Sequence, residues 1–425
     1  MNFLKTSENK NFIEHHDWYF DEIIPHSKLP VIPPPILFQN YKEAVCVRIN
    51  EKRILHSSYF IGVDWLNEET AIYIEPKLHK DSEKQIHYLQ MLFESLKHPD
   101  INPYTSGLVE IKWDRQFIEI DKSQDLLTPL LVVQFLKIVQ QIVRKGLKKS
   151  YFKVEQNLNS RIKGKIQVSR TIQKNKLQGK ELKSLCCYDD FGVDCLENRL
   201  LKRALLFVQR YLPTLKHLKV EEFTSKVFNY IFPAFEGVSE DVNHYEVTNV
   251  KAHVFYKEYE EAIHLGKLIL RRFGYNIINI QHQKTIQIPP FWIDMSKLFE
   301  LYVLGKLKEI YGNAVKYHPR GNYGETDFLL ISDPEIYIID AKYKTKYSGE
   351  GYKIEDIRQL SGYARDKNVL KKLGIVEKEY QKTVPNCLVI HSDQSSEKPL
   401  TRPIETKEIS QFVNFYKVGI KLPEL

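Results

Sequence analysis

The chain has 425 residues, too many for one ordinary domain, so two or three domains are expected, each able to bury its own core. Its formal net charge of +8 favours an anionic partner without identifying one. The five cysteines form no CxxC pair and the histidines lack ligand spacing, which argues against a zinc site and indicates reduced thiols.

The sequence predicts a cytoplasmic protein. The first 20 residues lack the uninterrupted apolar core of a signal peptide. The most apolar stretch, LLTPLLVVQFLKIVQQIV, is interrupted by Gln134, Lys137, Gln140 and Gln141, so it falls short of the roughly 18 apolar residues of a membrane span. We therefore expect no membrane partner.

Residues from about 30 to 120 carry short runs of alternating apolar side chains, separated by Pro, Asn and Gly. Examples are AVCVRI, AIYIEPKL and GLVEIKW. Such alternation is typical of strands joined by turns. We therefore expect a mostly β N-terminal domain over residues 1–122, with a role in docking a partner.

The apolar period then changes to that of helices. Thr128 and Pro129 make a suitable helix start, and apolar residues such as Leu131 and Phe135 follow at helical spacing. The segments CLENRLLKRALLFVQRYL and YKEYEEAIHLGKLILRRFGY have the same pattern. The sequence therefore predicts a helical, basic middle domain over residues 123–286.

This middle domain contains a strongly basic segment. Residues 144–183 hold 13 Lys or Arg against two Glu. Such a density can follow the phosphates of DNA, or it can form a solvated surface, and the run alone does not decide between them. No motif for reading bases accompanies it. The candidate DNA contacts are Lys148, Lys149, Lys153, Arg161, Lys163, Lys165 and Arg170.

A third domain is expected over residues 287–425. Pro289 and Pro290 mark its boundary, and a helix with Phe299 and Val303 on its apolar stripe opens it. Three strands, a helix and a strand follow, in the segments AVKYHP, TDFLLI, IYIIDAKY, KIEDIRQLSGYARDK and NCLVIHS. That order predicts an α/β domain with a mixed sheet.

Two of these strands carry charges among their apolar residues. With SDPE as a four-residue hairpin loop, Ile331 pairs with Ile336, and the same register sets Asp327 opposite Asp340. Opposed residues have Cβ atoms about 4.5–5.5 Å apart, so two like charges repel there. The strand period of two adds Lys342 to the same face.

This charge cluster has two explanations. Lys342 can neutralise a surface pair of carboxylates as a salt bridge. Alternatively, Mg²⁺ binds between Asp327 and Asp340, where it would polarise a phosphate and acidify a water, while Lys342 positions or deprotonates the nucleophile. The second arrangement is the chemistry of phosphodiester hydrolysis, and it is the interpretation we favour.

These residues resemble the core of PD-(D/E)xK nucleases. Asp327, a gap of 12 residues and Asp340-Ala341-Lys342 match its motif, although Thr326 stands where many members have Pro. The resemblance implies a restriction-endonuclease-like fold with a Mg²⁺ site, for which Mn²⁺ is a possible substitute. Its metal ligands would be Asp327, Asp340, the Ala341 carbonyl and an acidic residue of the preceding helix, here Glu300.

A second element extends the resemblance. Gln359 and Tyr363, in RQLSGY, are similar to the QxxxY element of RecB-like nucleases, and their spacing puts both on one helix face. The resemblance implies that they hold Lys342 or the nearby phosphate during catalysis.

Further segments narrow the likeness to the McrC family, the nuclease subunits of McrBC-type modification-dependent restriction systems. These are DMSKLFELYV, TDFLLI, IIDAKYK and DIRQLSGYA, with SRIKGKI, DCLENRLLKRAL and IYIEPKL upstream. The resemblance implies cleavage of double-stranded DNA with a McrB-like AAA+ GTPase ring that recognises methylated cytosine and that McrC docks on and stimulates. The chain has no G-x-x-x-x-G-K-[ST] motif, so it is expected to bind no nucleotide itself.

Two other functions stay open at this point. The C-terminal motifs also permit a RecB-like repair or processing nuclease unrelated to methylation. A function of another class is a regulatory module that mainly activates an NTPase ring, with the nuclease site secondary.

Overall fold

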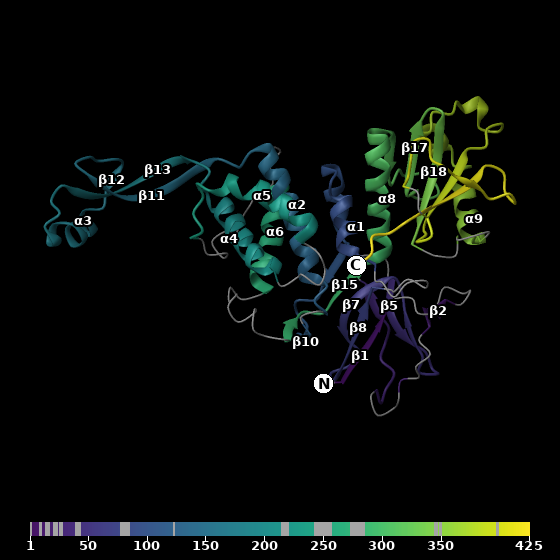
Figure 1. Cartoon of the computed structure of the whole chain (residues 1–425), viewed down its shortest axis with the longest axis horizontal. Coiled ribbons are helices and arrows are strands. Elements are labelled where there is room, and N and C mark those ends of the chain that lie inside the picture. Colours follow the sequence, from purple (N-terminus) through teal and green to yellow (C-terminus); the bar gives the residue numbers. More distant parts are fainter. Residues whose placement is uncertain are drawn as a thin grey trace. The chain divides into compact units, whose positions relative to one another are not determined.

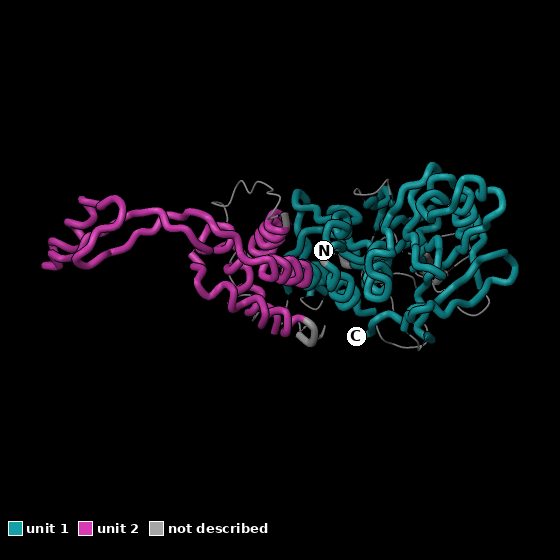
Figure 2. Tube along the Cα trace, turned by 90° about the horizontal axis from the view of Figure 1, so that it is seen from above, with its two compact units in different colours: residues 1–130, 217–220, 283–425 teal, residues 131–216, 221–282 magenta. Residues whose placement is uncertain are grey.

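The computed structural model forms two compact units, coloured separately in Figure 2. Unit 1 comprises residues 1–130, 217–220 and 283–425, and unit 2 comprises residues 131–216 and 221–282. The residues that the structure describes are 2–7, 11–12, 18–19, 24, 29–38, 44–76, 86–121, 124–213, 221–241, 257–272, 285–343, 347, 351–396 and 399–425.

The N-terminal segment of unit 1 is built mainly of strands, as predicted (Figure 1). A mixed sheet has the order β1-β8-β7-β15-β9, with strands Asn2–Ser7, Thr70–Glu75, Phe60–Trp65, Phe291–Asp294 and Val109–Ile111. Smaller sheets are β2 (Asn11–Phe12) with β3 (Trp18–Tyr19), β4 (Ile36–Phe38) with β5 (Ala44–Ile49) and β6 (Leu55–Ser57), and β10 (Ile118–Asp121) with β14 (Thr285–Ile288).

The strand β15 corrects the predicted start of the third domain. The FWID segment after Pro289 and Pro290 is a central strand of the N-terminal sheet, where it pairs with both β7 and β9. Trp292 is fully buried there and donates from Nε1 to Asp64 Oδ2 at 2.9 Å. An apolar strand of this kind gains more from a buried place in the N-terminal sheet than from opening a new domain.

The pairing of β7 with β15 requires glycine at position 62. Gly62 has a φ of 153°, and a Cβ there would lie 2.1 Å from the carbonyl oxygen of Phe291. We expect Gly62→Ala to lower the free energy of unfolding by about 3 kcal/mol or more, measured by urea denaturation. Gly146→Ala is the matched control, because its φ is 93° but nothing lies within 4 Å. Equal losses in the two variants would show that the contact with Phe291 is not the cause.

The C-terminal part of unit 1 has the predicted order of elements. Helix α8 (Met295–Tyr311) comes first, and a six-stranded mixed sheet follows in the order β16-β17-β18-β19-β21-β20. Helix α9 (Ile354–Tyr363) and α10 (Lys367–Lys372) connect β18 to β19. The strands are Val315–Tyr317, Phe328–Ser332, Glu335–Lys342, Asn386–Ser392, Phe415–Ile420 and Lys407–Glu408 in that sheet order.

Helix α1 (Tyr88–Ser95) packs against α8 and so joins the N- and C-terminal segments into one unit. The two helices lie close together, because a Cβ on Gly305 would lie 3.0 Å from Ser95 Cα, and Lys306 Nζ lies 2.5 Å from Glu94 Oε2.

The boundaries between the two units, near residues 130 and 283, fall close to the predicted domain limits at 122 and 286. The division of unit 1 into two separate domains stays a prediction.

Unit 2 contains the predicted helices α2 (Leu127–Lys145, shared with unit 1), α4 (Leu196–Tyr211) and α6 (Lys257–Arg272), together with α5 (Glu221–Ile231). By length and composition α2 could cross a membrane, yet 83% of its most apolar window is buried inside the protein. Gln134, Lys137 and Gln141 are buried with it. The extent of burial is typical of a helix in the core of a folded domain.

The middle domain is not helical throughout, which corrects the prediction. Strands β11 (Ser150–Asn159), β12 (Lys165–Ile166) and β13 (Lys183–Gly192) form a sheet, and α3 (Val168–Lys174) lies beside it. Within unit 2, β11 and β13 run as a long ribbon away from the helices (Figures 1 and 2). Only three of the 20 residues of β11 and β13 are buried, so the sequence lacks the apolar alternation that marks a half-buried strand.

Candidate active site

The hairpin of β17 and β18 has the predicted register. Ile331 pairs with Ile336, and Phe328 pairs with Ile339. The turn is tighter than the predicted four-residue loop, because Ser332 and Glu335 are themselves paired and only two residues connect the strands. The next position of this register places Asp327 beside the end of β18, where its Oδ2 accepts a hydrogen bond from Ala341 N at 2.7 Å.

The two aspartates at this end of the sheet repel each other. Burial raises the pKa of Asp327 well above its usual value, and the charge of Asp340 is the next cause, followed by Glu300. Burial also raises the pKa of Asp340, which is 2% exposed, against the lowering effect of Lys342. The ionised form of each carboxylate is therefore destabilised at this place unless a cation lies nearby.

Lys342 lies on the same face, as the strand period predicts. Its Nζ is 2.8 Å from Asp340 Oδ2 and 3.6 Å from Asp356 Oδ1. Burial alone would lower the pKa of Lys342, but the charges of Asp340, Asp356 and Asp327 outweigh it and raise this pKa. Lys342 is therefore a protonated cation at neutral pH. The neighbouring Tyr343 points the other way and packs against Phe299 of α8.

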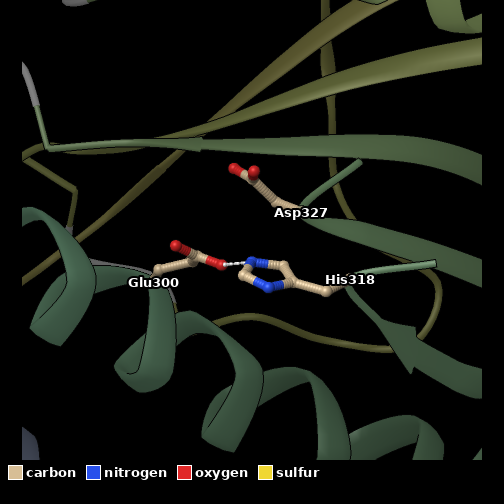
Figure 3. Close-up of side chains that lie close together, drawn as sticks. All are labelled: Glu300, His318 and Asp327. Carbon is tan, nitrogen blue, oxygen red and sulfur yellow. Dashed lines mark hydrogen bonds and ion pairs between the residues drawn. The ribbon is translucent and has the colours of Figure 1, made fainter. Parts of the chain in front are cut away.

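Glu300 projects from α8 toward this site, together with a histidine that the sequence analysis missed. Figure 3 shows Glu300, His318 and Asp327 converging, and one ligand atom of each lies within 4.8 Å of the others. His318 Nε2 is 2.5 Å from Glu300 Oε1. The pairing of β16 with β17 could have revealed His318, because it sets Tyr317 opposite Phe328 and hence His318 opposite Asp327.

Helix α9 brings Gln359 and Tyr363 to the same place. Gln359 Oε1 accepts a hydrogen bond from Lys342 Nζ at 3.4 Å, and Gln359 Nε2 donates to Tyr363 Oη at 3.5 Å. Tyr363 Oη donates to the carbonyl of Glu325 at 2.8 Å. The helix thus links the lysine-bearing strand to the chain segment just before Asp327.

Asp356 is a second residue that the sequence analysis missed. It is 5% exposed, and its Oδ2 accepts a hydrogen bond from the fully buried Tyr347 at 2.5 Å. Its other oxygen faces Lys342. Its position three residues before Gln359 was the available signal, since that spacing puts both side chains on one face of α9.

The seven candidate DNA contacts of unit 2 differ in their surroundings. Lys148 is half-buried and its Nζ lies 2.7 Å from Glu197 Oε1, so it stabilises the helical part of unit 2. Arg170 pairs with Glu155 at 2.6 Å, and Lys163 lies 3.8 Å from both Asp190 and the Tyr188 ring centre. Lys163 and Arg170 are nevertheless exposed, as are Lys149, Lys153, Arg161 and Lys165.

The sequence matches the family model described as McrBC 5-methylcytosine restriction system component over residues 55–373. Comparison with the curated proteins finds no match. The chain is similar to a chain in the solved structure titled "Refined half-complex from tetradecameric assembly of Thermococcus gammatolerans McrB AAA+ hexamers with bound McrC", with 13% identity, coverage of 99% of this chain and 95% of that one, and a TM-score of 0.42. The chain is also similar to a chain in the structure titled "Cryo-EM structure of the Thermococcus gammatolerans McrBC complex". The identity is 14%, the match covers 72% of this chain and 87% of that one, and the TM-score is 0.29. Because the family model covers more than half of the sequence, the chain belongs to the family of McrBC 5-methylcytosine restriction system components.

Proposed function

We propose that this chain is the Mg²⁺-dependent DNA endonuclease subunit of a McrBC-like restriction system, with a PD-(D/E)xK domain at its C-terminus. One observation carries the proposal. Asp327 and Asp340 meet at the end of a mixed sheet with Lys342 beside them, and Glu300 approaches from the preceding helix. Family membership supports the restriction system, the site chemistry supports phosphodiester hydrolysis, and both favour a cytoplasmic protein that acts with a McrB-like AAA+ GTPase.

The residues at the site fit a hard divalent cation. Asp327, Asp340 and Glu300 supply carboxylate oxygens and Ala341 supplies a carbonyl, which are the ligands that Mg²⁺ and Mn²⁺ accept. Burial raises the pKa of Asp327, the charges of Asp340 and Glu300 raise it further, and a bound cation would oppose both effects. When bound, Mg²⁺ supplies Lewis-acid polarisation of a phosphate and a more acidic water. His318 holds the Glu300 carboxylate in place through its short contact.

The chain's own groups supply the remaining chemistry. Lys342 is held by Asp340, Asp356 and Gln359, and its raised pKa keeps it protonated. Its ammonium group would donate toward the attacking water or a phosphate oxygen, where it stabilises developing negative charge. Gln359 and Tyr363 fix the direction of its ammonium group.

Replacing Glu300 with Gln tests its part in metal binding. We expect Glu300→Gln to raise the Mg²⁺ concentration for half-maximal cleavage by roughly 10-fold, because a neutral amide is a weaker ligand than a carboxylate. A Mg²⁺ titration of the cleavage rate measures this. Glu309→Gln, an exposed position on the same helix, is the matched control and should leave the titration unchanged. Identical titrations for all three proteins would exclude Glu300 from the metal site.

The function is tested by purifying the chain together with a McrB-like AAA+ protein and measuring cleavage of methylated and unmethylated DNA with Mg²⁺. The proposal expects cleavage that needs Mg²⁺, methylation and the partner together. Cleavage independent of methylation and partner would favour the RecB-like processing nuclease. Stimulation of the partner NTPase without any cleavage would favour the regulatory module.

A further inference from the structure

The connection between β16 and β17 is an ordered hairpin that leads from the candidate active site to an exposed tyrosine. Beyond the paired strands, His318 N donates a hydrogen bond to Asp327 O at 3.0 Å, and Gly321 N donates one to Gly324 O at 2.7 Å. Between them, the backbones of Arg320 and Glu325 form an antiparallel β-bridge. The register set by Tyr317 and Phe328 thus continues to the end of the connection. Its tip is the dipeptide Asn322-Tyr323.

This tip is fixed to the neighbouring helix α10. Asp366 accepts hydrogen bonds from Tyr323 N at 2.7 Å and from Asn322 Nδ2 at 3.0 Å. Lys372 Nζ donates to the Arg320 carbonyl at 2.6 Å. A Cβ on Gly321 would lie 2.8 Å from Asp366 Oδ2, so the hairpin backbone packs tightly against this carboxylate. The tip is therefore held in one conformation by bonds to its backbone.

The ring of Tyr323 is exposed although its position is fixed. The residue is 71% exposed. One edge of the ring contacts Tyr363, with ring centres 5.7 Å apart, and a Cβ on Gly362 would lie 3.5 Å from it. A large aromatic side chain held in place with most of its surface in water gains little for folding. Such a side chain is well suited to a partner that stacks on it.

The place of Tyr323 points to the DNA strand as that partner. It lies four residues from Asp327 along the hairpin, about 13 Å at the rise of a β-strand. Its ring touches Tyr363, which contacts Gln359, which in turn contacts Lys342. The same hairpin and the segment of α9 and α10 to which it is bound also carry exposed cations, namely Arg320, Arg358, Arg365 and Lys367. A DNA backbone drawn by these cations would pass the ring within a few nucleotides of the cleaved phosphate.

We propose that Tyr323 stacks on a nucleobase of the DNA strand near the cleaved phosphate, and this inference rests on the proposed nuclease function for the location of the DNA. Every base offers a π-face, so the contact is tolerant of sequence and favours a base that is already unstacked. Tyr323 is then a DNA-positioning residue, separate from the groups that act on the phosphate. It would favour cleavage where the duplex is locally opened.

The full chain is tested for binding to a single-stranded oligonucleotide that contains 2-aminopurine, without divalent metal so that no cleavage occurs. Tyr323→Ala should weaken binding by roughly 5- to 100-fold and reduce the quenching of 2-aminopurine, as expected for loss of one base–aromatic stack. Tyr323→Phe should bind within about twofold of wild type, because stacking needs the ring and not the hydroxyl. Tyr230→Ala, at a 50% exposed tyrosine of α5, is the control and should change nothing.

The salt dependence separates stacking from charge. Tyr323→Ala should keep the slope of log K against log salt, whereas Arg320→Ala on the same hairpin should reduce it by about one. Unchanged affinity in Tyr323→Ala, or equal loss in Tyr323→Phe, would overturn stacking while leaving the nuclease proposal intact. If the wild-type chain binds no DNA, the stacking proposal is also refuted. The cleavage assay with the partner then tests the nuclease proposal independently.

Discussion

Asp340→Ala should reduce DNA cleavage by at least about 10³-fold, because it removes a metal ligand and the counterion of Lys342 in one step. Asp340 is buried and its Oδ2 is 2.8 Å from Lys342 Nζ. Without this carboxylate, the site loses affinity for the cation and the ammonium group loses its orientation. Cleavage of methylated DNA in the presence of Mg²⁺ and the partner AAA+ protein measures the effect.

The same variant separates the nuclease function from the regulatory one. Stimulation of the partner NTPase should persist in Asp340→Ala, because the change is confined to a buried site at the end of the C-terminal sheet. Asp340→Asn keeps the size of the side chain and guards against misfolding as the cause. Glu377→Ala, at an exposed acid of the same region, is the matched control. Unchanged restriction by Asp340→Ala would refute the proposed role of the site.

The hairpin that carries this site was predictable because its determinants are local. A turn between two apolar runs sets the register, and the strand period of two then decides which side chains share a face. Both rules hold for Ile331 with Ile336, and for Asp340 with Lys342. The error in the turn, which has two residues between the strands instead of four, left the register unchanged because Ser332 and Glu335 simply extend it.

The residues that were missed depend on contacts between distant segments. His318 reaches the site through the pairing of β16 with β17, whose register the two strand runs alone do not give. The FWID strand joins a sheet whose other members lie more than 170 residues earlier, and a short apolar run does not reveal its partner. The ribbon of β11 and β13 was missed for the opposite reason, since its exposed polar strands carry little apolar pattern.

Asp327→Asn should abolish cleavage to a similar degree, by at least about 10³-fold, and at the same time stabilise the metal-free protein at neutral pH. The carboxylate is destabilised in the folded state by burial and by the charges of Asp340 and Glu300. An amide removes this repulsion, and its oxygen can still accept the hydrogen bond from Ala341 N. We expect the free energy of unfolding in EDTA to rise by about 1 kcal/mol or more at pH 7.

The pH dependence of this gain follows from the direction of the pKa shift. Because folding raises the pKa of Asp327, wild type is most stable where the group is protonated in both states, below its unfolded pKa of about 3.9. Its stability falls as the pH rises from the unfolded pKa through the folded pKa, so the advantage of Asp327→Asn should be larger at pH 7 than at pH 5 and vanish toward pH 4. Mg²⁺ should raise the melting temperature of wild type and not that of the variant, because it binds the intact site. Urea denaturation in EDTA at several pH values measures the difference, and a variant less stable than wild type at pH 7 would contradict the repulsion between Asp327 and Asp340.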